Sequence, residues 1–251
     1  MHTLHDTAAR LLLGRRSGQP QAACAPADAD DAYAAQAAVA QALGWFGDGV
    51  PRHWKSGGPS RQAQATHAPL PPAGVWPSPA TAGAWPFHQR GIEAEIALRL
   101  GRPVDADLAA GLDLTQARRL VDAQCVSIEI VDSRWAEGLQ APALAKLADL
   151  QSHGALVLGP WTEHDAAHDW SSQRCQVQIG AQPVQVFQGS HAMGDPAWVL
   201  LAWLRHATRG DAVVPAGTVV TTGTWCGILQ AQAGDRVQVG FDGIGAASVQ
   251  L

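Results

Sequence analysis

Hydrophobic and polar residues alternate over two segments near the middle of the chain, residues 92–98 and 125–131. This alternation is typical of β-strands that bury one face. Short segments of the same kind, separated by glycine-containing turns, fill the last third of the chain, so we expect a series of strands there. They are residues 175–179, 184–187, 219–222, 237–241 and 247–251.

Segments rich in alanine and leucine predict helices over residues 5–14 and 30–43, and Asp28 and Asp30 are placed to cap the second one. Further helices are expected over residues 106–120 and 196–208. Between residues 44 and 84 the sequence is rich in Gly, Pro, Ser and Trp, which predicts a long surface loop without a helix or central strand. Loops of this length often act as lids or binding loops.

These elements together predict an α+β fold whose body is a mixed β-roll or sandwich. The chain has 251 residues and 47% hydrophobic content, enough to bury the core of one domain with a smaller helical part. We therefore divide it into an N-terminal helical segment, residues 1–60, and a β-rich domain, residues 61–251.

Charge and cysteine content narrow the possible functions. The net charge is −5 and no run of Lys or Arg occurs, so neither nucleic acid nor a membrane is expected as a partner. No apolar run approaches the ~20 residues that span a bilayer, and the first residues do not resemble a signal peptide, which predicts a cytoplasmic protein. The four cysteines, at positions 24, 125, 175 and 226, form no CxxC pair and are expected to be buried thiols.

Three of the five glutamates are candidates for a metal site. Glu93 and Glu95 are separated by one residue of a predicted strand, so both point to the same side of it. Glu129 stands between two isoleucines, where an unpaired carboxylate would be costly to bury. Three carboxylates suit a hard cation such as Mg²⁺ or Mn²⁺. Alternatively, Glu93 and Glu95 lie on a solvated face and Glu129 pairs with Arg134 or another arginine.

Two stretches carry a resemblance to a known family. Residues 91–98, with the glutamate pair, and residues 127–134, in which an acidic strand runs into Asp-Ser-Arg, resemble the 2-keto-4-pentenoate hydratase branch of the fumarylacetoacetate hydrolase superfamily. Supporting matches occur in the same order along most of the chain. The resemblance implies a mixed β-roll, with residues 61–251 as the catalytic domain, in which Glu93, Glu95 and Glu129 hold Mg²⁺ or Mn²⁺. It also implies small 2-oxo acids as substrates.

Only two lysines, Lys55 and Lys146, occur in the chain. Lys55 lies in a segment that resembles the family's Lys-x-Gly, where a lysine near the metal acts on the substrate enol. An ammonium there can stabilise charge, or transfer a proton if its pKa is lowered, whereas arginine stays protonated. The alternative is an exposed loop lysine.

The sequence departs from the family pattern in one respect. The resemblance implies an acidic residue in the loop before the glutamate pair, but no Asp or Glu occurs between Ser56 and Ile92. His67 and His88 are the titratable imidazoles of that loop. We assign the missing role to His88 because it lies close in sequence to Glu93, the alternative being a surface histidine.

The function that the resemblance implies is a metal-dependent hydro-lyase, most similar to 2-keto-4-pentenoate hydratase and active in aromatic compound catabolism. Decarboxylation of a 2-oxo diacid such as 4-oxalocrotonate, hydrolysis of an acylpyruvate and a non-catalytic role remain alternatives. A homo-oligomer is expected, and a decarboxylase of the same pathway is a candidate partner. The pair His164 and His168 has helical metal-ligand spacing but lacks the H-E-x-x-H order, so we expect a solvated loop there.

Overall fold

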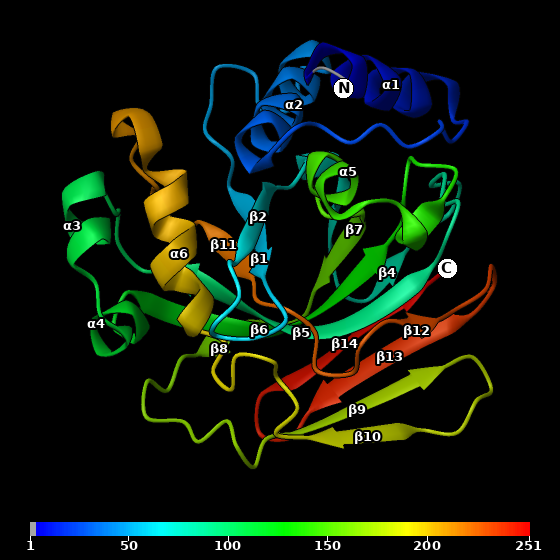
Figure 1. Cartoon of the computed structure of the whole chain (residues 1–251). Helices are drawn as coiled ribbons and strands as arrows, with labels where there is room; N and C mark the ends of the chain where they lie inside the picture. Colours follow the sequence, from blue (N-terminus) through cyan, green and yellow to red (C-terminus); the bar gives the residue numbers. More distant parts are fainter. Residues whose placement is uncertain (1–3) are drawn as a thin grey trace.

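Two β-sheets form the body of the protein in the computed structural model, which describes residues 4–251 (Figure 1). The larger sheet has nine strands. In spatial order these are β2 (Thr66–Pro69), β1 (His53–Gly57), β11 (Val219–Thr221), β5 (Gly91–Leu100), β6 (Val121–Val131), β7 (His153–Leu158) and β3 (Val75–Pro77), with β12 (Leu229–Gln230) on β5 and β8 (Thr162–Glu163) on β6. The smaller sheet has the order β10 (Gln185–Gln188), β9 (Arg174–Ile179), β13 (Arg236–Phe241), β14 (Gly245–Gln250) and β4 (Ala80–Thr81).

The main hydrophobic core includes one face of the central strands β5 and β6 together with residues of the smaller sheet. Ile92, Ile96 and Ile128 are fully buried there, in one cluster with Val239 and Val249 of the smaller sheet. Because successive strand residues point to opposite faces, the odd-numbered residues over 93–97 of β5 and 125–129 of β6 point away from this core. The three glutamates lie on that second face.

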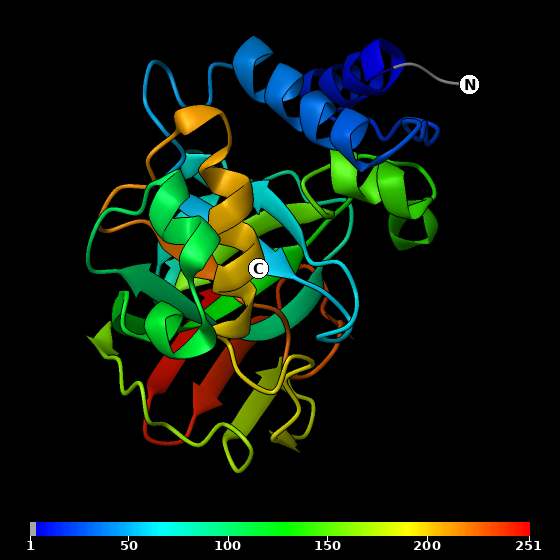
Figure 2. The same ribbon diagram turned by 60° about the vertical axis from the view of Figure 1, so that its left-hand side comes forward.

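The helices form two groups (Figures 1 and 2). One contains α1 (Leu4–Ser17), α2 (Ala29–Ala42) and α5 (Ala143–Ala148), and the other α3 (Ala106–Gly111), α4 (Leu114–Arg118) and α6 (Trp198–Ala207). Short 3-10 turns occur at Pro72–Gly74, Gly138–Gln140 and Arg209–Asp211. Leu11, Val39 and Trp135 form the core of the first group, a separate cluster that holds α5 beside the larger sheet.

Most elements expected from the sequence are confirmed, including both N-terminal helices, the late helix and the strands of the last third. Asp28 caps α2 by accepting a hydrogen bond from the backbone N–H of Asp31. The single helix expected over residues 106–120 is wrong, because the chain forms two short helices there. Asp113 begins the second one with a capping box to Gln116, which starts a new helix instead of continuing the first.

The expectation of a long loop over residues 44–84 is also wrong. The segment supplies β1, β2, β3 and β4, and β1 pairs on both sides, with β2 and β11. Residues 53–57 contain no proline, so every N–H of β1 is available for pairing. The strands that contain or adjoin prolines, β2, β3 and β4, all lie at sheet edges, where a missing donor costs least.

The expected division of the chain at residue 60 stays a prediction. Strand β1 falls within the first 60 residues but belongs to the larger sheet, whereas α1 and α2 pack in the separate helical cluster. Residues 1–3, which begin the expected helical segment, lie outside the described residues. Over residues 4–251, no helix has the length and apolar character needed to cross a bilayer.

Candidate metal centre

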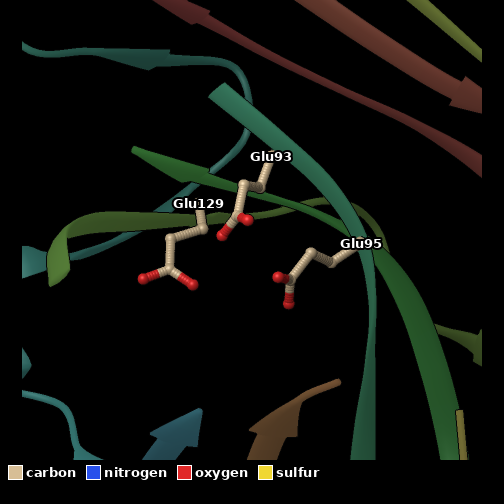
Figure 3. Close-up of side chains that lie close together, drawn as sticks. All are labelled: Glu93, Glu95 and Glu129. Atoms are coloured by element: carbon tan, nitrogen blue, oxygen red, sulfur yellow. The ribbon is translucent and has the colours of Figure 1, made fainter. Parts of the chain in front are cut away.

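The three glutamates converge on one point above the larger sheet (Figure 3). Glu93 and Glu95 come from β5, and Glu129 comes from β6, directly opposite Glu93 in the antiparallel register. One ligand atom from each side chain can be chosen so that all three lie within 4.8 Å of one another. Glu95 and Glu129 are buried and Glu93 is half-buried, so the predicted solvated-face alternative does not describe this group.

Lys55 reaches this group from β1. Its Nζ donates to Glu129 Oε1 at 2.5 Å and to the backbone carbonyl of Gln151 at 3.1 Å. The structure therefore places Lys55 inside the site and not on an exposed loop. Arg134, the partner considered for Glu129, binds Asp149 instead, with Nε to Oδ1 at 2.8 Å.

His153, on β7, is a site residue that the sequence analysis missed. Its Nδ1 lies 3.0 Å from Glu129 Oε1, the same oxygen that accepts from Lys55. The second oxygen, Glu129 Oε2, is buried and has no hydrogen-bond partner within the described part of the chain. An ionised carboxylate oxygen with no donor is costly to bury. A hard divalent cation shared with Glu93 and Glu95 is a fitting partner for it.

Glu95 is held in position from the neighbouring strand β11. The Thr221 hydroxyl donates a short hydrogen bond to Glu95 Oε2, and the Gly223 N–H donates to the same oxygen at 3.0 Å. The Thr221 hydroxyl also lies 2.9 Å from that of Ser127 on β6. Gly223 has a φ of +100°, a backbone conformation that favours glycine, so this position can turn its N–H toward the carboxylate without steric cost.

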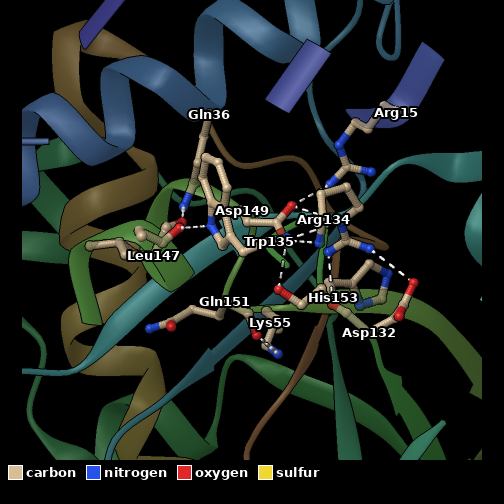
Figure 4. Close-up of polar contacts among 12 residues, drawn as sticks. Arg15, Gln36, Lys55, Asp132, Arg134, Trp135, Leu147, Asp149, Gln151 and His153 are labelled. Carbon is tan, nitrogen blue, oxygen red and sulfur yellow. Dashed lines mark hydrogen bonds and ion pairs between the residues drawn. The ribbon is translucent and has the colours of Figure 1, made fainter. Parts of the chain in front are cut away.

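A strained turn just before β7 positions two groups of the site, the Gln151 carbonyl that accepts from Lys55 and the His153 ring that contacts Glu129 (Figure 4). Three consecutive non-glycine residues, Leu150, Gln151 and Ser152, have φ values of +53°, +56° and +58° just before β7. Each such residue costs about 1–2 kcal/mol. The turn follows Asp149, whose buried carboxylate accepts from the side chains of Arg15 and Arg134. This arrangement directs the Gln151 carbonyl toward Lys55 and starts β7 at His153.

Burial and crowding of like charges shift the pKa values of the site. Burial, followed by the charges of Glu95 and Glu129, raises the pKa of Glu93 to about 8. Burial and the Glu129 charge likewise raise the pKa of Glu95 to about 7. Burial acts on Glu129 in the same direction, but Lys55 and His153 outweigh it and lower its pKa. For Lys55, burial is outweighed by Glu129 and Glu93, so its pKa is raised. A bound cation would favour the ionised form of all three carboxyls.

The group opens into a cavity of about 380 Å³, called here the carboxylate cavity. Its lining includes Lys55, Glu93 and Glu95 together with the apolar side chains of Val131, Leu139 and Ile228. His88 is not among the lining residues. Its side chain is exposed and its backbone N–H donates to Asp132, so the structure does not bring the proposed catalytic histidine to the glutamates.

The pair His164 and His168 and the four cysteines do not belong to the glutamate group. His164 Nδ1 contacts Gln124, and His168 Nε2 contacts Gln173, each at 2.8 Å. Over residues 4–251, the three glutamates are the only group of three or more acidic, histidine or cysteine side chains close enough to share an ion. All four cysteines are buried and free, as expected.

Comparison with curated proteins agrees with the resemblance seen in the sequence. The chain is 32% identical over 164 residues to the 2-hydroxyhexa-2,4-dienoate hydratase of Comamonas testosteroni, covering 63% of this chain and 59% of that protein. It is 30% identical over 157 residues to 2-keto-4-pentenoate hydratase 1 of Dechloromonas aromatica, covering 62% and 58%. The chain thus spans less than two thirds of the length of these relatives.

Solved structures show the same fold. The 4-oxalocrotonate decarboxylase from Pseudomonas putida G7 superposes with a TM-score of 0.80 in its complex with calcium and acetate, and 0.82 in its complex with magnesium and adipate. Both alignments cover 100% of this chain and 98% of that chain at 18% identity. The model of the fumarylacetoacetate (FAA) hydrolase C-terminal family matches residues 47–251. The chain therefore belongs to the fumarylacetoacetate hydrolase family.

Proposed function

We propose that the protein is a divalent-metal-dependent hydro-lyase that acts on a small 2-oxo acid or its 2-hydroxy-dienoic tautomer. The observation that carries this proposal is the convergence of Glu93, Glu95 and Glu129 in a cavity, with Glu129 Oε2 buried and unpartnered among residues 4–251. The curated hydratases that the chain resembles support the reaction class. Magnesium, calcium and manganese in structures of the same fold support a divalent cation.

Each glutamate would contribute carboxylate oxygen to Mg²⁺ or Mn²⁺. Such an ion would supply positive charge that polarises a 2-oxo acid and makes its enol accessible. Thr221 and the Gly223 N–H hold the Glu95 carboxylate, while Lys55 and His153 hold Glu129 through one oxygen and leave the other free. The chain therefore orients the carboxylates before any ligand arrives.

Lys55 has a raised pKa and stays protonated in the metal-free site at neutral pH. It would enter the reaction as a fixed positive charge or as a proton donor at Nζ. The apolar side chains of Val131, Leu139 and Ile228 line the same cavity and would contact the hydrocarbon part of a substrate. They also exclude water from part of the cavity, which strengthens the electrostatic effect of Lys55.

Decarboxylation of a 2-oxo diacid is the second candidate. Hydration requires a proton at one carbon and an activated water at another, whereas decarboxylation chiefly requires electron withdrawal. The segment between Ser56 and Ile92 contains no carboxylate, and His88 lies outside the carboxylate cavity. This favours decarboxylation, while the resemblance to curated hydratases at 30–32% identity favours hydration. Acylpyruvate hydrolysis is a third reaction that uses the same enol chemistry.

Turnover measurements distinguish these functions. Metal-stripped protein is incubated with 2-hydroxypenta-2,4-dienoate and, separately, with oxaloacetate, each with and without Mn²⁺. Loss of the dienoate's ultraviolet absorbance only with metal supports hydration, and release of carbon dioxide without water addition supports decarboxylation. Metal-dependent ligand binding with no turnover of either would favour a non-catalytic relative. If Mn²⁺ does not bind in calorimetry, the metal-centre proposal is wrong.

The assembly and pathway context are also proposals. We expect a homo-oligomer, with a pathway decarboxylase as a candidate partner. The mass of the purified protein in analytical ultracentrifugation would test the oligomeric state.

A further inference from the structure

Both lysines of the chain line the same cavity. Lys55 lies on β1, and Lys146 lies 91 positions later on α5, yet both contribute to the lining of the carboxylate cavity. Lys55 is committed to Glu129. Lys146 is half-buried and its Nζ donates to the backbone carbonyl of Leu139 at 3.1 Å. It is thus a second cation at the cavity, and it does not pair with the glutamate whose charge Lys55 balances.

The charge of Lys146 is not balanced by the protein. Within the described part of the chain, no carboxylate forms an ion pair with it. A lysine ammonium has three N–H donors, and the Leu139 carbonyl takes one of them. Two donors therefore remain for a ligand in the cavity.

The lining of the cavity combines acidic, basic and apolar side chains. Glu93 and Glu95 line the part where a metal would hold the 2-oxo acid group, and Lys146 lines the same cavity without a hydrogen bond or ion pair to any of the three glutamates. The apolar lining is formed by Val131, Leu139 and Ile228. A carboxylate placed against such side chains is costly unless it meets a cation or several donors. The ammonium of Lys146 meets that requirement.

The geometry points to Lys146 as a specificity-determining residue that binds a second carboxylate, at the end of the substrate remote from the 2-oxo acid group. The preferred substrate class would then be an unsaturated 2-oxo diacid, and a monoacid such as 2-hydroxypenta-2,4-dienoate would be used less efficiently. This inference rests on the proposed function, since it assumes that the 2-oxo acid group binds at the glutamates. It applies equally to hydration and to decarboxylation.

Binding of unreactive analogues tests the inference without requiring turnover. With Mn²⁺ present, calorimetry compares 2-oxoadipate with 2-oxohexanoate, which has a terminal methyl in place of the second carboxylate. Oxalate, which occupies only the metal end, is the internal control. We expect about tenfold tighter binding of 2-oxoadipate, the scale of one charge-assisted hydrogen bond in a partly exposed site. Lys146→Met should abolish that preference, Lys146→Arg should retain most of it, and neither should change oxalate binding.

Arg16→Met, which removes an exposed cation from α1, is the matched control and should leave the preference intact. The inference is overturned if the wild-type protein shows no preference for the diacid, or if Lys146→Met weakens both analogues and oxalate equally. The latter would indicate a structural role through the Leu139 carbonyl. If none of the three ligands binds in a metal-dependent way, the proposed function itself fails and this inference fails with it.

Discussion

Glu93 and Glu129 lie directly opposite each other on the paired strands β5 and β6. Like charges at such a cross-strand position destabilise a sheet, and Glu95 adds a third carboxyl within reach. Lys55 supplies one positive charge to this group. That charge alone does not balance three ionised carboxylates. A sequence selected only for stability would not place three acids here, so the arrangement indicates a binding site.

Glu129→Gln should reduce Mn²⁺ affinity by at least about 100-fold, because an amide oxygen replaces a charged ligand at the centre of the group. Calorimetric titration of the metal-stripped variant would measure the loss. Glu163→Gln is the matched control, since Glu163 is exposed on β8, and it should bind Mn²⁺ like the wild type. Unchanged affinity in Glu129→Gln would remove Glu129 from the metal site.

The contribution of Glu93 and Glu95 to the stability of the metal-free protein should fall as pH rises from about 5 to about 8. The pKa values of Glu93 and Glu95 are raised from 4.5 to about 8 and about 7. In that range these two groups hold more protons in the folded state than in the unfolded state, so their contribution to the free energy of unfolding decreases with increasing pH. The pKa of Glu129 is lowered and that of Lys55 is raised, so these two groups change the stability only outside this pH range.

Thermal unfolding at both ends of the range, with and without Mg²⁺, would measure this effect. Histidines with lowered pKa values, such as His67 at about 3 and His206 at about 4, act in the opposite direction below pH 6.5, so the glutamate effect is measured as a difference between variants. Mg²⁺ replaces the protons, so its stabilisation should be larger near pH 8 than near pH 5, and the metal-free Glu93→Gln variant should become more stable relative to the metal-free wild type as pH rises. A difference between these two proteins that does not change with pH, together with no response to Mg²⁺, would contradict the raised pKa of Glu93.

The glutamate group could be predicted from the sequence because it depends on local periodicity. Glu93 and Glu95 share a face in any strand, and Glu129 follows from the family resemblance to the acidic strand before Asp-Ser-Arg. The pairing of Lys55 with Glu129 depends on how β1 enters the sheet beside β11. No local pattern in a glycine- and proline-rich segment indicates that position.

His153 and the turn before it could not be predicted for a different reason. Leu150, Gln151 and Ser152 are not residues that favour positive φ, so the turn is imposed by the surrounding contacts and not by its own sequence. His88 was chosen for its closeness in sequence to Glu93. However, His88 is exposed, its backbone N–H donates to Asp132, and its side chain does not line the carboxylate cavity.

Lys55→Arg should lower turnover by about 100-fold while changing Mn²⁺ affinity only a few fold. The guanidinium keeps the positive charge beside Glu129 but does not release a proton at neutral pH, so proton transfer is lost and charge balance is kept. Steady-state kinetics with whichever of the dienoate and oxaloacetate the wild-type protein turns over, and calorimetry with Mn²⁺, would separate the two effects. Wild-type turnover in this variant would exclude Lys55 from proton transfer.

Thr221→Val should weaken Mn²⁺ binding by about tenfold and shift its pH dependence upward, because Thr221 acts as a positioning residue. Valine keeps the shape of the side chain but removes the hydroxyl that donates to Glu95, leaving the Gly223 N–H as its donor. With fewer hydrogen bonds to the ionised form, the pKa of Glu95 rises further. Mn²⁺ titrations at several pH values would reveal the shift. A purely structural role would lower the melting temperature but leave the midpoint of the pH dependence unchanged.

The strain in the turn before β7 can be measured with two variants of Gln151. Both Gln151→Ala and Gln151→Gly remove the side-chain contact with Thr66, and they differ in the cost of a φ near +56°. Glycine adopts this conformation freely and alanine does not, although glycine also loses more entropy on folding. We expect Gln151→Gly to be more stable than Gln151→Ala by about 1 kcal/mol in denaturant unfolding. The more flexible turn should also hold the carbonyl that accepts from Lys55 less firmly, so Gln151→Gly should have the lower turnover despite its greater stability. If alanine were the more stable and the less active of the two, the turn would be neither strained nor part of the support for Lys55.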